Sequence, residues 1–141
     1  MTNTALVRLE TEDHAPWLLV IAAITLLGGV WLRVRGLPGA DLHGPLHRAG
    51  IMDPLCGGTR ATYLLVRGDV AAAWSWNPLV PLLALAITAV VIRFIVGRLG
   101  GRWVNVYAPR RVWFVALVAG AVVLEINQQM QADRLTSVVP V

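Results

Sequence analysis

Residues 78–96 read PLVPLLALAITAVVIRFIV, and this stretch decides the fold. Arg93, near its end, is the only charged residue in it. A helix needs about 20 apolar residues to cross a lipid bilayer, within a range of about 17–25. The stretch meets that length, so it predicts a membrane-spanning helix.

Two more apolar blocks, Pro16–Leu32 and Val112–Ile126, flank this stretch. The first is at the low end of the spanning range and the second is short, but flanking Ala, Trp and Asn residues extend both. The composition agrees, since 57% of the residues are hydrophobic and only 14% are charged, whereas soluble domains carry about 25% charged residues. We therefore expect an all-α integral membrane protein with three transmembrane helices.

The expected organisation is a single membrane domain, 1–141. Its segments are a polar N-terminal tail (1–15), helix 1 (16–32), a loop (33–57), a motif hairpin (58–76), helix 2 (78–96), an arginine-rich loop (97–111), helix 3 (112–130) and a tail (131–141).

The charge pattern bears on source and orientation. The formal net charge is +4, and all 12 basic residues are arginine, which is typical of a GC-rich bacterial genome. Basic residues in a membrane protein mark headgroup contact and the cytoplasmic side, so we expect no nucleic-acid partner. Loop 97–111 carries four arginines and no acid. This favours a cytoplasmic N-terminus in the bacterial cytoplasmic (inner) membrane, with several passes.

A compact polar motif interrupts the apolar sequence. It runs from Asp53 to Ala61 as DPLCGGTRA, continues with Arg67-Gly68-Asp69 and closes with Asn77-Pro78. Its middle, residues 58–76, predicts an interfacial or re-entrant helical hairpin between helices 1 and 2. Gly57 or Gly58 is expected to start the first half, with Thr59 as its N-cap and Cys56 as a poorer alternative, and Asp69 is the expected N-cap of the second half.

The motif resembles that of a known family. With Cys56-Gly57-Gly58-Thr59-Arg60-Ala61, then Gly68-Asp69 and Asn77-Pro78, the chain is similar to the short bacterial membrane proteins grouped as domain-of-unknown-function family 2752. Their Pro-x-Cys-Gly-x-Thr-Arg-Ala run, Gly-Asp pair and Asn-Pro pair are matched in order. The resemblance implies a membrane location and brings no established activity.

Two interpretations of this motif remain open. The amide groups at a helix start, with a threonine hydroxyl and an arginine fork, suit a phospholipid phosphate. Alternatively, Arg60 pairs with Asp53 or Asp69 as a structural clamp, because a charge buried in a membrane needs a partner. Both interpretations use the same residues: Gly57, Gly58, Thr59, Arg60, Asp53, Asp69 and Arg67.

Cys56, the single cysteine, also has two readings. A thiolate beside arginine at a helix start is reactive, whereas a cysteine next to glycines is often a small buried hydrophobe. A weak alternative is a metal site of His43, His47 and Cys56. Gly44-Pro45 breaks the helix that would align the histidines, and the spacing matches no metal template. We therefore expect no metal and no other cofactor.

The sequence contains no nucleotide-binding loop and no complete catalytic triad. We expect a non-catalytic small accessory subunit of a larger bacterial membrane complex, with the hairpin as a structural clamp and a phospholipid headgroup site. The expected partners are membrane lipids and other integral membrane subunits. One alternative is a thiol-dependent or lipid-modifying enzyme that uses Cys56 and Arg60, and a second is a small homo-oligomeric channel.

Overall fold

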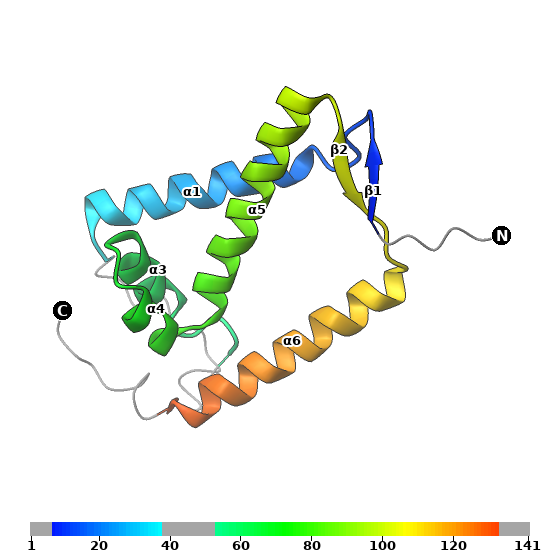
Figure 1. The fold of residues 1–141 in the computed structure, drawn as a ribbon. Coiled ribbons are helices and arrows are strands. Elements are labelled where there is room, and N and C mark those ends of the chain that lie inside the picture. The colour runs from blue at the N-terminus through cyan, green and yellow to red at the C-terminus, as the bar shows by residue number, and fades with distance from the viewer. Residues whose placement is uncertain (1–6, 38–52, 133–141) are drawn as a thin grey trace.

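A computed structural model describes residues 7–37 and 53–132 of the chain (Figure 1). Most of this part is helical. The elements, in chain order, are β1 (Val7–Glu10), α1 (Trp17–Arg35), α3 (Gly58–Val66), α4 (Val70–Trp76), α5 (Leu79–Gly100), β2 (Trp103–Val106) and α6 (Arg110–Met130).

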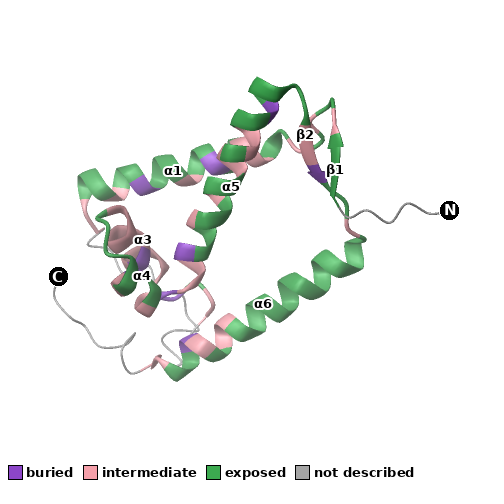
Figure 2. Cartoon of the chain, in the orientation of Figure 1, coloured by how far each residue is buried: buried purple, intermediate pink, exposed green. Residues whose placement is uncertain are grey.

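Helices α1, α5 and α6 are long and apolar enough to cross a membrane. Their mean hydropathies are 2.0, 2.6 and 1.4. At about 1.5 Å per residue they are about 28–33 Å long, close to the roughly 30 Å hydrocarbon core of a bilayer. Most of their surface is exposed, as Figure 2 shows. The predicted all-α class with three spanning helices is confirmed.

Two of the spanning helices extend beyond their expected ends. Helix α1 includes Arg33 and Arg35, and α5 continues through Arg98 to Gly100. An arginine can lay its aliphatic stem along the helix and place its guanidinium among the headgroups. Charge therefore marks where a helix leaves the hydrocarbon region, but it does not end the helix.

The hairpin of α3 and α4 lies between α1 and α5 in the chain, where the sequence predicted it. It packs against α1 at Gly29, where an added Cβ would lie 3.3 Å from the Val66 side chain. The Arg33 guanidinium also donates a hydrogen bond from Nη1 to the Val66 carbonyl oxygen. A small residue and an arginine on α1 thus hold the end of α3.

A two-stranded antiparallel ribbon, β1 with β2, was not predicted. Val7 pairs with Val106, and Glu10 pairs with Trp103. The sequence suggested a polar tail over 1–15 and an irregular loop over 97–111. Each strand has only four residues, which is too short for alternation to stand out, and the pairing joins segments far apart in the chain.

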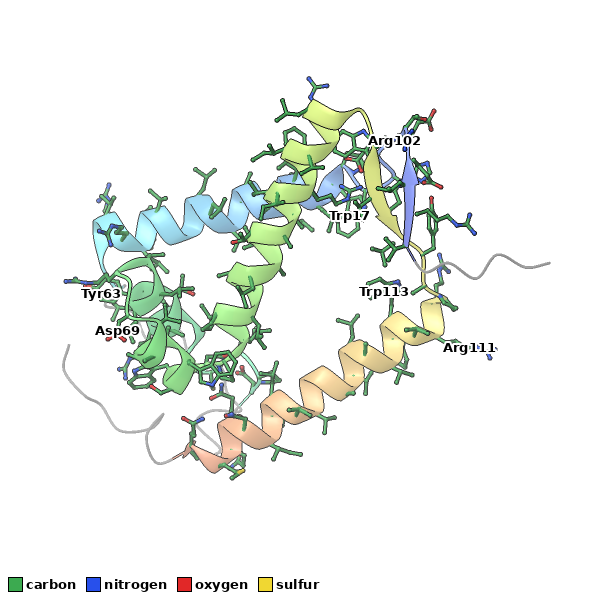
Figure 3. All side chains as sticks on the ribbon, viewed as in Figure 1. Trp17, Tyr63, Asp69, Arg102, Arg111 and Trp113 are labelled. Carbon is green, nitrogen blue, oxygen red and sulfur yellow. The ribbon has the colours of Figure 1, made fainter. Side chains whose placement is uncertain are left out.

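The ribbon and the hairpin lie at opposite ends of the spanning helices. The ribbon adjoins the start of α1 and the end of α5, whereas the hairpin follows α1 and precedes α5 (Figure 1). Figure 3 shows Tyr63 and Asp69 at one end of the molecule, and Arg102 and Arg111 at the other. The β1 segment and the segment between α5 and α6 therefore lie at the same end of the molecule.

Helix α6 stands apart from the other two spanning helices (Figure 1). Residues 110–123 are all exposed. Burial begins only near its C-terminal end, where Gln128 is completely buried and Ala132, just beyond the helix, packs against Cys56. Along most of its length α6 therefore presents its side chains outward.

Candidate functional site

Asn77, between α4 and α5, is the central residue of the motif. Its side chain is completely buried. The amide nitrogen donates to the carbonyl oxygens of Pro54 (3.0 Å) and Cys56 (2.9 Å). The amide oxygen accepts from the backbone N–H of Leu79 at 2.9 Å. One asparagine thus joins the turn before α3 to the start of α5.

Sequence reasoning quoted Asn77 within the motif but did not assign it a role. Its amide could have indicated a structural role, because an asparagine between two apolar helices needs hydrogen-bond partners for both its oxygen and its nitrogen.

Arg60 does not pair with Asp53 or Asp69 in the described part of the chain, so the clamp differs from the expected one. Its guanidinium lies over the Trp76 ring, 4.7 Å from the ring centroid. A cation over the face of an indole is attracted by the ring quadrupole. Arg60 therefore joins α3 to the end of α4 by a cation–π contact.

Both aspartates of the motif serve local turns instead. The Asp53 carboxylate accepts from the backbone N–H of Leu55 at 2.7 Å, which fixes the turn leading into Cys56. The Asp69 carboxylate accepts from the backbone N–H of Ala72 at 2.9 Å and caps α4, so the predicted N-cap there is confirmed.

Helix α3 begins at residue 58, as predicted, but its N-cap differs from the predicted Thr59. Gly57, with φ 74°, is the N-cap residue, and α3 begins at Gly58, so Thr59 is already inside the helix. No side chain caps this end. A left-handed φ favours glycine, which explains Gly57. The N–H of Gly58 donates to the carbonyl oxygen of Leu55 at 2.9 Å.

Cys56 is buried, with 6% of its surface exposed, and packs against Trp76 and Ala132. Burial raises the pKa of its thiol, because the thiolate would lose its hydration. A raised pKa lowers the thiolate fraction and therefore the reactivity. These surroundings match the reading of Cys56 as a small packed residue better than that of an activated nucleophile.

Arg67 directly follows α3, and it contacts a different aromatic side chain from Arg60. Its Nη1 donates to the Tyr63 hydroxyl at 2.6 Å, and its guanidinium lies 5.3 Å from the centre of the Tyr63 ring. Arg67 and Arg33 line an open hollow.

The weak metal alternative used two histidines, His43 and His47, that lie outside the described residues. Within residues 7–37 and 53–132, no three His, Cys, Asp or Glu side chains gather as metal ligands would.

A second polar cluster lies at the ribbon end of the molecule and was not predicted. Arg93 of α5 is its centre. Its Nη2 donates to Asp13 Oδ1 (2.6 Å) and Asn105 Oδ1 (2.9 Å), and its Nε donates to the Val104 carbonyl oxygen (2.6 Å). The Asp13 and Arg93 side chains are both 16% exposed. The late arginine of the apolar stretch is therefore paired within the chain.

Asn105 and Tyr107 extend this cluster to Glu10. The Asn105 amide, which is buried, donates to Glu10 Oε2 at 2.6 Å, and the Tyr107 hydroxyl donates to the same oxygen at 2.7 Å. Accepting these two bonds lowers the pKa of Glu10, and donating to Glu10 raises the pKa of Tyr107. The bond from Arg93 lowers the pKa of Asp13. The cluster thus holds both carboxyl groups in their charged form.

Comparison with known proteins gives one match. The family model described as "Protein of unknown function (DUF2752)" matches residues 45–91, which include the motif from Asp53 to Asn77. No curated protein and no solved structure matches the chain.

Proposed function

We propose that the chain, whose residues 45–91 match the family model of the proteins of unknown function DUF2752, is a non-catalytic small accessory subunit of a larger bacterial membrane complex. The observation that carries this proposal is the isolation of α6. Among the described residues, this helix of 21 residues is exposed over 110–123 and becomes buried near its C-terminal end, so it has a long face available for another membrane protein.

The surface of α6 suits close helix packing. Ala116 and Gly120 are four residues apart and therefore lie on one face, and an added Cβ at Gly120 would meet no atom within 4 Å. Small residues at this spacing let two helix backbones approach closely in lipid, where packing rather than the hydrophobic effect drives association. This face is the proposed contact with the larger subunit.

In this proposal the α3–α4 hairpin is a structural clamp within the subunit. Asn77 and Arg60 tie α3, α4 and α5 together, and the raised pKa of Cys56 disfavours thiol chemistry. The N-terminus is proposed to be cytoplasmic, which is supported by the four arginines of residues 97–111, at the end of α5, in the connecting segment and at the start of α6.

Purification from the native membrane tests the proposal. The full chain, tagged at its C-terminus, is extracted in mild detergent, and the co-purifying proteins are identified by mass spectrometry. We expect one larger membrane protein in constant ratio to the chain. Gly120→Leu should remove this protein, whereas Ala121→Leu, the same kind of change about 100° around the helix, should retain it.

Two results would reject the accessory role. One is a chain that purifies alone as a closed homo-oligomer and conducts ions in planar bilayers, which supports the channel. The other is a Cys56→Ser variant that assembles normally but loses the cellular function, which supports thiol chemistry.

A further inference from the structure

An open hollow lies at the hairpin end of the molecule, between α1 and the end of α3. Its volume is about 320 Å³, and the described residues that line it are Arg33 and Arg67. That volume is at the lower end of the roughly 300–1,000 Å³ found for small-ligand sites. Both arginines are exposed, so a ligand can reach them.

Both guanidinium groups are held by hydrogen bonds, and neither meets a carboxylate of the described residues. Arg33 donates from Nη1 to the Val66 carbonyl oxygen, and Arg67 donates from Nη1 to the Tyr63 hydroxyl. Neither arginine forms an ion pair with any residue of 7–37 or 53–132. A guanidinium has five N–H donors, so each retains donors for an anion.

The position of the hollow selects the kind of anion. Arg33 is in the last turn of spanning helix α1, close to the exposed Trp31. Tryptophan near the end of a spanning helix marks the level of the lipid headgroups. At this level the abundant anion is the phosphate of a phospholipid, and an arginine fork matches two of its oxygens.

We propose that the hollow between Arg33 and Arg67 binds the phosphate group of an anionic membrane lipid. This site shares Arg67 with the residues expected from the sequence, but it lies at the other end of α3 and includes Arg33. The lipid site does not depend on the docking of α6, so either this proposal or the accessory role can be rejected without the other.

Native mass spectrometry of the purified full chain tests the site. Phosphatidylglycerol, diacylglycerol and inorganic phosphate are each titrated into the delipidated protein in detergent. We expect one phosphatidylglycerol to bind in preference to diacylglycerol, which has the same tails without phosphate. Arg33→Gln and Arg67→Gln should each weaken binding of phosphatidylglycerol by about fivefold.

Matched variants separate charge from folding. Arg98→Gln and Arg102→Gln remove the same charge at the ribbon end and should bind phosphatidylglycerol as the wild type does. Tyr63→Phe removes the hydroxyl that holds Arg67 but keeps both guanidinium groups, so it should weaken binding of phosphatidylglycerol less than Arg67→Gln does. Equal loss in the Arg98 and Arg33 variants, or no preference over diacylglycerol, would overturn the site. If inorganic phosphate binds as tightly as phosphatidylglycerol, the site recognises free phosphate, and the proposal that its ligand is a lipid is overturned.

Discussion

The side-chain amide of Asn77 donates to the carbonyl oxygen of Cys56 at 2.9 Å, and so joins two turns that lie on either side of the α3–α4 hairpin. Both residues are buried. The same asparagine also orders the start of α5. Asn77 therefore helps to fix the position of the hairpin relative to α5.

Asn77→Ala is expected to destabilise the folded protein by about 2–3 kcal/mol, because it leaves buried backbone groups without partners. Thermal unfolding in detergent, followed by circular dichroism, measures the loss. Asn127→Ala is the matched control, since Asn127 accepts only from Gln131 Nε2 on the same turn. Equal unfolding temperatures for the two variants would contradict the role of Asn77.

Gly97→Ala is expected to displace β2 from α5. An added Cβ would lie 2.4 Å from the Trp103 ring, so the indole would have to move. Overpacking of this kind costs about 1–3 kcal/mol. Gly100→Ala makes the same change one turn later, where no atom lies within 4 Å. Trp103 fluorescence in a variant without the other tryptophans should shift for Gly97→Ala and stay constant for Gly100→Ala.

Acid should open the ribbon end of the molecule. The pKa values of Asp13 and Glu10 are lowered by their hydrogen bonds in the folded protein. The stability from these carboxylates is therefore present above the unfolded pKa of about 4 and is lost as the pH falls through the lower folded values.

Unfolding temperatures measured between about pH 6 and pH 2 check this prediction. They should fall most steeply below about pH 4, and Asp13→Asn should be less stable at neutral pH with a shallower fall. An Asp13→Asn protein with the acid profile of the wild type would show that the pair with Arg93 does not contribute.

Cys56 should react slowly with thiol reagents while the protein is folded. Its burial and raised pKa both reduce the concentration of accessible thiolate. Because the chain has one cysteine, labelling by a membrane-permeant maleimide reports on this site alone. Labelling should accelerate in Asn77→Ala, where the turn around Cys56 loosens. Rapid labelling of the folded wild type would favour the enzyme alternative.

The sequence predicted what depends on local composition. Hydropathy located the three spanning helices, and Gly68-Asp69 located the break between α3 and α4, including the cap by Asp69. Spacing along the chain could not decide the partner of Arg60, because an aspartate and a tryptophan were both within reach. Nor could it reveal the ribbon, because neither four-residue strand is distinctive without its partner.

The pairing of Val7 with Val106 has a consequence for biogenesis. The ribbon cannot close until the ribosome has released the second strand, so α1 first enters the bilayer without this restraint. After closure, inverting α1 would mean pulling Asp13 from Arg93 and carrying charged groups through hydrocarbon. We therefore expect the ribbon to close after α1 has inserted and then to oppose reorientation of this helix.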